Sequence, residues 1–275
     1  MKIEIKKPIF VIGCFRSGTT VFCKKLMSHP DLATITQTTK KIPASLLLTR
    51  ILMFFRSDKK NYDPSDGSKI WNRFRNKDDY FMGREDATLE ARKYVDRIIR
   101  NHLLLFNKPR FLSKSTSNSL RIGFLNELYP DAFFIHIIRD GRAVANSMRA
   151  GRIKHEKKFN GALVPGWREI IDLPMVESCG LHWKKTMECI LKSTAKLSKE
   201  RYMEVKYEDF VVKPKEILTR VGNMCGLKWN NGQLDNIGSD LENRNYKWRD
   251  KFTLSEIETL NSILGDLLRK LGYEV

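Results

Sequence analysis

The sequence predicts a three-layer α/β/α fold, in which helices cover both faces of a central parallel sheet. Short apolar runs alternate with amphipathic stretches, and the clearest runs are Ile9–Ile12 and Ala132–Ile138. Continuous apolar runs of this length are typical of strands buried on both faces, and their alternation with helices favours parallel pairing. No repeat, low-complexity segment or linker divides the chain, so residues 1–275 are predicted to form one domain.

The remaining elements follow from periodicity and end signals. Further strands are predicted at Ala33–Thr36, Arg110–Lys114 and Arg201–Val205. Helices are predicted from Thr19 onward and at Pro43–Phe55, Glu85–Phe106, Ser119–Tyr129, Asp140–Arg149, Met175–Leu197, Lys215–Cys225 and Thr253–Leu271. In the last helix Thr253 and Glu256 form a capping box, and Gly272 is the stop signal.

Three polar, turn-rich segments are predicted as loops: 57–83, 150–174 and 226–251. The first is a long excursion, and long loops in compact domains often cover a functional site.

Composition indicates a globular protein that meets anions. The net charge of +18 favours acidic ligands, nucleic acid or a membrane surface, and does not choose among them. The five cysteines show no metal-site spacing and predict reduced thiols in a cytoplasmic protein. The N-terminus lacks the apolar core of a signal peptide, and the apolar run at Leu46–Phe55 is too short to span a bilayer. That run is expected to form a buried or a surface helix.

A glycine-bearing turn follows the first strand and leads into a helix. Gly13 and Gly18 allow a tight backbone close to a ligand, and the helix start offers free N–H groups and a favourable dipole. Arg16 adds a guanidinium, and Ser17, Thr19 and Thr20 add hydroxyl donors. The stretch is therefore predicted to bind a phosphate-like group; the alternative is a plain strand–turn–helix joint with an exposed arginine.

The same loop nearly matches the nucleotide-binding pattern G-x-x-x-x-G-K-[ST]. The spacing of Gly13 and Gly18 agrees, but Thr19 occupies the place of the lysine that reaches the β- and γ-phosphates of ATP. The chain thus departs from the pattern at the residue that ATP chemistry needs most.

A second anion site is predicted where the Ala132–Ile138 strand ends. Arg139 follows that strand directly, and Ser147 lies about two helical turns further on, near the same face. One phosphate could contact both side chains. Alone the motif is weak, because an Arg–Asp surface pair and a solvent-facing serine would look the same.

Together the two stretches resemble sulfotransferases that use 3′-phosphoadenosine 5′-phosphosulfate (PAPS). The first loop is similar to the family's 5′-phosphosulfate loop, and Arg139 with Ser147 is similar to its 3′-phosphate site. Other stretches that look like family landmarks are HPDLA at 29–33, LSKS at 112–115, LYPDAFFIHIIRDGRAVANSM at 128–148, VKYEDFVVKP at 205–214 and LGY at 271–273. RDGRAVANSM, and IP at 42–43, look most like the tyrosylprotein branch, although bacterial glycan and lipid sulfotransferases share much of the pattern.

The resemblance implies a P-loop-like phosphosulfate-binding loop, sulfuryl transfer from PAPS with PAP as product, and no metal. Lys114 matches the family lysine that stabilises charge on the departing phosphate oxygen, a role that a lysine at a strand end would fill electrostatically. Tyr207 matches an aromatic residue that contacts adenine; a half-buried core tyrosine is the equal alternative. The acceptor is expected to carry a hydroxyl, on a glycan, a lipid or a tyrosine-like group, and the charge favours an acidic glycan or peptide.

The catalytic base is where the sequence departs from the family. Many members carry a glutamate soon after the second strand, but Ile35–Thr39 holds no carboxylate, and Thr116 replaces the histidine of the cytosolic branch. Glu85, at a predicted helix start beside the long loop, is the first substitute; Asp86 and His182 follow, and each has a structural alternative.

Three rival functions remain. A P-loop nucleotide kinase or NTPase would bind ATP with magnesium, against which Thr19 argues. A basic module that binds nucleic acid or an anionic polymer without catalysis predicts steep salt dependence and leaves the spacing of both motifs unexplained. A third possibility keeps the fold but has lost the reaction, because the usual base is missing. Against these rivals, sulfuryl transfer without nucleic-acid binding is the prediction that uses both motifs.

Overall fold

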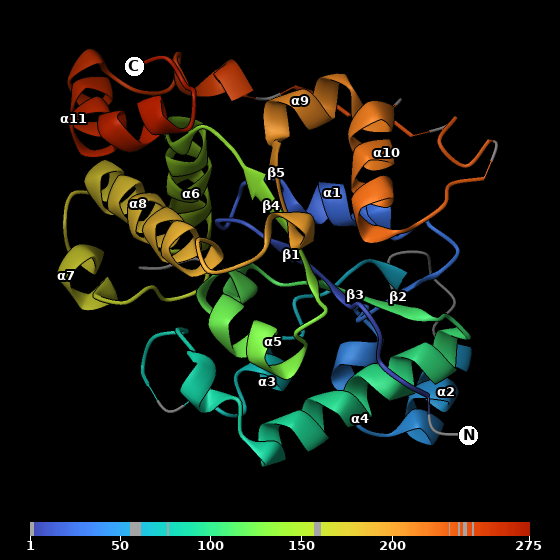
Figure 1. The fold of residues 1–275 in the computed structure, drawn as a ribbon. Helices are drawn as coiled ribbons and strands as arrows, with labels where there is room; N and C mark the ends of the chain where they lie inside the picture. The colour runs from blue at the N-terminus through green and yellow to red at the C-terminus, as the bar shows by residue number, and fades with distance from the viewer. Residues whose placement is uncertain are drawn as a thin grey trace.

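A five-stranded sheet forms the centre of the computed structural model (Figure 1). The structure describes residues 3–55, 62–75, 77–156, 161–230, 232–235, 237–238, 241–243 and 245–275. The strands are β1 (Ile9–Ile12), β2 (Leu32–Thr34), β3 (Arg110–Lys114), β4 (Phe133–Ile138) and β5 (Tyr202–Lys206). They pair in parallel in the order β2-β3-β1-β4-β5. All the carboxyl ends therefore lie along one edge, where ligands bind in such sheets.

Both faces of the sheet are covered, as a three-layer fold requires. Phe10 and Ile12 of β1 enter a core that includes residues of the helices α4, α5, α6, α8 and α11. Ile9 and Val11 point the other way, into a core shared with α1, α9 and α10. Alternate residues of a strand face opposite sides, so burial of all four explains the continuous apolar run. The predicted α/β/α fold class is confirmed.

The described helices are α1 (Thr19–Leu26), α2 (Leu46–Phe54), α3 (Ser68–Trp71), α4 (Leu89–Phe106), α5 (Ile122–Leu128), α6 (Gly141–His155), α7 (Trp167–Ile171), α8 (Met175–Thr194), α9 (Tyr207–Val212), α10 (Pro214–Cys225) and α11 (Leu254–Lys270). Short 3₁₀ turns lie at η1 (Thr39–Lys41), η3 (Arg84–Asp86), η4 (Thr116–Leu120), η5 (Lys199–Arg201) and η6 (Asn245–Trp248). The capping box of Thr253 and Glu256 is confirmed at the start of α11.

The predicted helix Glu85–Phe106 is wrong at its start. Arg84–Asp86 is a separate 3₁₀ turn, and α4 begins after Thr88, whose hydroxyl accepts a hydrogen bond from Ala91 N at 3.2 Å. The threonine is the better cap, because it satisfies a free N–H of the first turn. Leu89, the first residue of the helix, is exposed.

Other boundaries also moved. The second strand is Leu32–Thr34 rather than 33–36, and α2 begins after Ser45, which caps it, rather than at Pro43. The predicted loop 57–83 contains α3, and the loop 150–174 contains the end of α6 and α7. Residues 57–61 and 76 of the first loop, and 157–160 of the second, lie outside the described residues. Over the described part of the chain, every helix is too short or too polar to cross a membrane.

Candidate active site

The loop after β1 is held at its first glycine and leads at its other end into an uncapped helix start. Ser119 in η4 bonds the first glycine twice: its hydroxyl accepts from Gly13 N at 2.8 Å and donates to Gly13 O at 2.9 Å. At the other end α1 starts from Gly18 without a side-chain cap. The first N–H groups of a helix lack intrahelical partners, so this start can receive an anion. Ser119 is a site residue that sequence reasoning missed; the hydroxyl-rich stretch after β3 was its only signal.

Both glycines are required by their surroundings. Gly13 has φ 151° and a Cβ there would lie 2.5 Å from Ile137 O; Gly18 has φ 92° and a Cβ would lie 2.4 Å from the Tyr207 ring. Arg16, between them, also adopts the left-handed region at φ 72°, which costs a non-glycine residue on the order of 1 kcal/mol. Such strain is often found at functional sites.

Arg16 and Arg139 meet at the edge of the sheet. Arg16 Nε donates to Ser147 Oγ at 2.8 Å, and Arg139 Nη1 donates to Arg16 O at 3.1 Å. The structure thus brings together the two stretches predicted to bind anions, which are more than a hundred residues apart in sequence. Ser147 contacts Arg16 directly, so the predicted phosphosulfate and 3′-phosphate sites are neighbours.

Tyr207, the first residue of α9, contacts this cluster. Its ring centroid is 4.6 Å from the Arg139 guanidinium carbon, and its ring packs on Gly18. Asn245 of η6 accepts from Arg139 Nε at 3.2 Å, which brings the polar segment after α10 to the same place. Burial lowers the pKa of the Arg139 guanidinium from its ordinary value, so an anion bound there would favour the charged form. Asn245 itself was not among the residues predicted for the site, although residues 244–251 stand where the family that the sequence resembles often has a loop over the 3′-phosphate.

One buried hydroxyl in the loop fits a ligand. Ser17 is 1% exposed, and its Oγ has no hydrogen-bond partner among the described residues. A buried polar atom without a partner is costly, and a phosphate oxygen would satisfy it. Thr19 is buried and Thr20 exposed in the first turn of α1, next to Ser17. The loop therefore fits an anion with several oxygen acceptors.

Lys114 ends β3 beside this loop, because β3 pairs with β1 and Lys114 is in register with Val11. Its ammonium lies 2.6 Å from Asp66 Oδ1, and the lysine side chain is nearly buried at 8% exposure. Asp66 was not predicted as a site residue. It belongs to the long excursion, whose sequence has no motif that would mark it.

The backbone explains how Asp66 reaches the sheet. The excursion returns alongside the residues after β2: Ser65 N donates to Ile35 O at 2.8 Å, and Gln37 N donates to Asp63 O at 3.0 Å. Asp63 also pairs with Lys24 of α1 at 2.7 Å. A carboxylate from another segment thus stands near the place where 35–39 supplies none.

A cavity of about 470 Å³ opens between α1 and this returning segment. Its lining residues are Thr20, Gln37, Lys40, Lys41, Pro64, Ser65, Asp66, Gly67, Ser68, Lys69 and Lys114. Four lysines and one aspartate give it a net positive lining. It adjoins the helix start through Thr20, so a molecule in the cavity would face an anion held by the loop.

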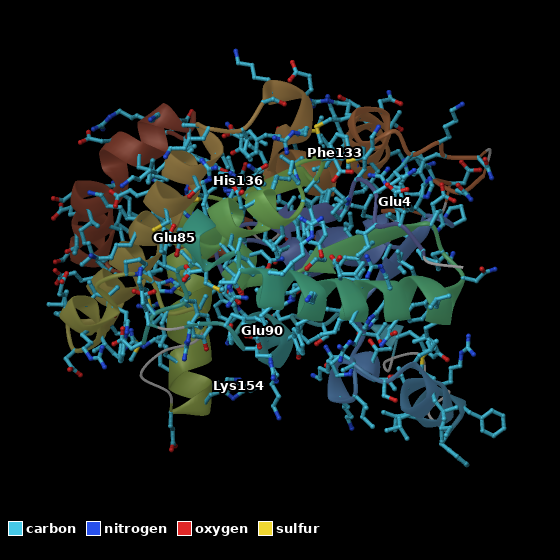
Figure 2. The ribbon with its side chains drawn as sticks, turned by 60° about the horizontal axis from the view of Figure 1, so that its bottom comes forward. Glu4, Glu85, Glu90, Phe133, His136 and Lys154 are labelled. Carbon is cyan, nitrogen blue, oxygen red and sulfur yellow. The ribbon has the colours of Figure 1, made fainter. Side chains whose placement is uncertain are left out.

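The structure does not bring Glu85 to this place. Glu85 (Figure 2) lines a different cavity, together with residues of α5 and α8, and shares it with no residue of the phosphate loop. Asp86 is buried and caps the turn, since its Oδ2 accepts from Gly83 N at 2.8 Å. His182 is a buried residue of α8. Its Nε2 forms a hydrogen bond with Ala162 O at 2.9 Å, and burial lowers its pKa to about 4. On this geometry, none of the three substitutes considered for the base stands beside Lys114.

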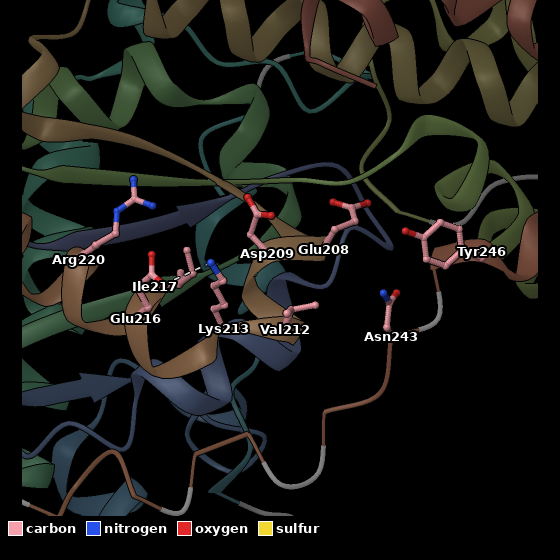
Figure 3. Close-up of a pocket in the computed structure, with 9 residues that line it drawn as sticks. All are labelled: Glu208, Asp209, Val212, Lys213, Glu216, Ile217, Arg220, Asn243 and Tyr246. Carbon is pink, nitrogen blue, oxygen red and sulfur yellow. Dashed lines mark ion pairs between the residues drawn. The ribbon is translucent and has the colours of Figure 1, made fainter. Parts of the chain in front are cut away.

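A third cavity, of about 370 Å³, lies between α9, α10 and the segment before η6 (Figure 3). Three of its lining residues are acidic: Glu208, Asp209 and Glu216, the last paired with Lys213 at 3.8 Å. Burial raises the pKa of the Glu208 carboxyl. This mixed lining suits a phosphate less well than the arginine cluster does. Across the described residues, no group of three or more His, Cys, Asp or Glu side chains could hold a metal ion.

Comparison with known proteins agrees with this geometry. The model of a family described as "Sulfotransferase family" matches residues 8–231. Protein-tyrosine sulfotransferase A of Caenorhabditis elegans is 23% identical over 97% of this chain and 67% of its own length. A protein-tyrosine sulfotransferase of Drosophila melanogaster is 25% identical over 82% of this chain and 39% of its own. Nodulation protein NoeE of Sinorhizobium fredii is 24% identical over 96% and 65%. The chain therefore spans only 39% to 67% of the length of these relatives.

Solved structures share the fold. A sulfotransferase from Mycobacterium avium superposes with a TM-score of 0.65 at 15% identity, over 99% of this chain and 78% of that one. The sulfotransferase domain from the curacin biosynthetic pathway gives 0.55 at 16% identity, over 99% of both chains.

Proposed function

The chain belongs to the sulfotransferase family, and we propose that it transfers a sulfuryl group from PAPS to an acceptor hydroxyl. The observation that carries the proposal is the pair formed by Lys114 and Asp66, 2.6 Å apart in a basic cavity beside the phosphate loop. The phosphate loop offers an anion site, and the adjoining cavity offers a cation, Lys114, and a carboxylate, Asp66. In-line sulfuryl transfer depends on positioning and charge stabilisation more than on covalent catalysis, and this arrangement supplies both.

The donor would be held by the residues that meet at the edge of the sheet. Ser17, Gly18, Thr19 and Thr20 offer hydroxyl and helix N–H donors to the 5′-phosphosulfate, with Arg16 beside them. Arg139 and Ser147 are assigned the 3′-phosphate. Tyr207 is assigned the adenine, because its ring is already fixed beneath Arg139.

Lys114 and Asp66 divide the chemical work. As the sulfur–oxygen bond to the phosphate breaks, the electron pair leaves with PAP, and Lys114 stabilises the charge on that oxygen. The acceptor oxygen forms the new bond to sulfur, and Asp66 takes its proton as general base. Asp66 thus replaces Glu85 in our assignment, because it alone of these carboxylates lines the cavity of Lys114.

The acceptor we propose is an acidic hydroxyl compound, an anionic glycan or an acidic peptide. Lys40, Lys41 and Lys69 line the same cavity, and such a lining attracts negative charge. A reducing compartment such as the cytoplasm is proposed as its setting, since all five cysteines are free thiols. The whole of residues 1–275 is taken to act as one domain.

A ligand scan followed by a transfer assay tests this proposal. PAP should raise the melting temperature more than ADP or AMP, and radiolabelled PAPS should label an acidic peptide or a sulfated glycan. Equal stabilisation by ADP with magnesium would favour the kinase alternative instead. Nucleic-acid binding with steep salt dependence and no preference for PAP would favour the basic module.

A further inference from the structure

Helix α2 carries an apolar face that points to solvent. Leu47, Phe54 and Phe55 are 69%, 83% and 78% exposed, and Leu48 and Ile51 are about half exposed. At 100° per residue these five side chains share an arc of about 120° on one side of the helix. We call them the α2 face. Figure 1 shows α2 at the periphery, next to α4.

The opposite side of the helix is partly buried. Thr49 is the buried residue of α2, and Leu46, Leu52 and Met53 beside it are half-buried. The helix is therefore apolar on both sides, and large apolar side chains remain exposed on its outer side. A surface helix of a soluble protein normally presents polar side chains to solvent, so the α2 face indicates a partner.

The charged residues of 39–55, the segment that contains η1 and α2, are all positive. Lys40 and Lys41 of η1 and Arg50 of α2 are exposed, and residues 39–55 contain no aspartate or glutamate. Arg50 borders the apolar arc at 100° per residue. Large apolar side chains next to basic ones are the combination that binds an anionic lipid surface, where each part finds its counterpart.

We propose that the α2 face docks on the surface of an anionic phospholipid bilayer. Leucine and phenylalanine side chains would enter the boundary between headgroups and acyl chains, and the three cations would meet the headgroups. The net charge of +18 strengthens the attraction.

A second copy of the chain is the less favourable occupant. A two-fold interface would bring the α2 face against itself, and with it Lys40, Lys41 and Arg50 of both copies. Like charges would then oppose each other with no acidic residue from 39–55 between them. An anionic bilayer satisfies the apolar and the basic side chains together.

Docking would also place the cavity of Lys114 near the bilayer, because Lys40 and Lys41 line that cavity and are joined to α2 by only four residues, 42–45. Resting on the proposed function, this makes the hydroxyl of a membrane-held anionic molecule the natural acceptor.

Vesicle sedimentation tests the docking without any donor or acceptor. The full chain is mixed with vesicles of phosphatidylcholine containing phosphatidylglycerol, or of phosphatidylcholine alone. The test variant carries Leu47→Ser, Phe54→Ser and Phe55→Ser. The matched control carries Ile153→Ser, Val212→Ser and Leu254→Ser, three exposed apolar residues elsewhere. Circular dichroism establishes that both variants are folded.

We expect the wild type and the control to sediment with the anionic vesicles, and less with neutral ones, and the test variant to bind at least about tenfold more weakly. Raising the salt concentration should weaken wild-type binding. Absence of vesicle binding, or equal binding by the test variant, would overturn the proposal. So would a wild-type dimer in light scattering that the test variant abolishes while vesicles have no effect. A failed sulfuryl-transfer assay would leave this result unchanged.

Discussion

The proposed donor half of the site, formed by Arg16–Thr20, Arg139, Ser147 and Tyr207, is held together by contacts among its own side chains. The proposed acceptor half, residues 36–55 and 62–71, is held to the sheet by contacts with other segments. In the donor half the side chains follow strands β1, β4 and β5 and contact one another directly. In the acceptor half a returning segment pairs with the residues after β2 and reaches the sheet through Lys114 and Asp66.

This difference predicts that the two halves control different quantities. Contacts already formed in the free protein need not be ordered when the ligand binds, so the donor half should determine the affinity for PAP. The acceptor half holds the proposed base, Asp66, on a segment outside the sheet. Variants in the two halves should therefore change different quantities.

The largest effect is expected from Asp66→Asn. Loss of a general base should lower the rate of transfer by on the order of 10²–10⁴ while PAP affinity stays near that of the wild type. Asp63→Asn is the matched control, since Asp63 lies on the same segment but pairs with Lys24. Single-turnover transfer and calorimetry with PAP measure the two quantities. Normal transfer by Asp66→Asn would leave the acceptor half without its assigned base.

A smaller effect on rate is expected from Lys114→Ala, on the order of 10²–10³, because an electrostatic contact to the departing oxygen is lost. Binding of PAPS should weaken much less, since the contact strengthens only in the transition state. Lys69→Ala, a lysine of the same cavity, is the control. If rate and affinity fall together, Lys114 is an anchor of the donor half rather than a catalytic residue.

That the residues of the proposed donor half lie together could be predicted from the sequence, because they are tied to strand ends. The apolar runs at Ile9–Ile12 and Ala132–Ile138 locate the strands, and the parallel sheet brings Arg16 and Arg139 to one edge. The register of Lys114 with Val11 follows from the same sheet. Local pattern and topology agree here, so a motif was enough.

The acceptor half could not be predicted in the same way. Asp66 reaches Lys114 only through backbone pairing between 63–65 and 35–37, a contact that no local signal announces. Glu85 looked like part of a helix start, but Thr88 is the true cap and η3 places Glu85 at another cavity. The exposure of α2 was likewise hidden, because an apolar run is equally typical of a buried helix.

Low pH should lower the stability of the folded protein through His102, which contacts the acceptor half. Its Nε2 lies 2.9 Å from Thr39 Oγ1 of η1, and burial lowers its pKa from 6.5 to about 4. The unfolded chain binds a proton below pH 6.5 and the folded chain only near pH 4, so stability falls as the pH falls through this window. The loss is about 2–3 kcal/mol at pH 4.5.

His102→Phe tests this assignment by removing the titrating group while keeping a ring between Phe106 and Phe111. Urea unfolding at pH 7.5 and pH 4.5 should show a smaller loss of stability in the variant than in the wild type. Identical losses would mean that other groups carry the acid sensitivity.

The most direct test of the account is whether Arg139 recognises the 3′-phosphate. PAP and AMP differ only by that phosphate, so calorimetry of both ligands on the wild type and on Arg139→Ala isolates its contribution as a difference of differences. The account predicts a strong wild-type preference for PAP that falls by about 10- to 150-fold in the variant, the value of a charge-assisted contact of about 1.5–3 kcal/mol, while AMP affinity changes little. An equal loss for both ligands would contradict it, because Arg139 would then support the loop through Arg16 and Asn245 without contacting the 3′-phosphate.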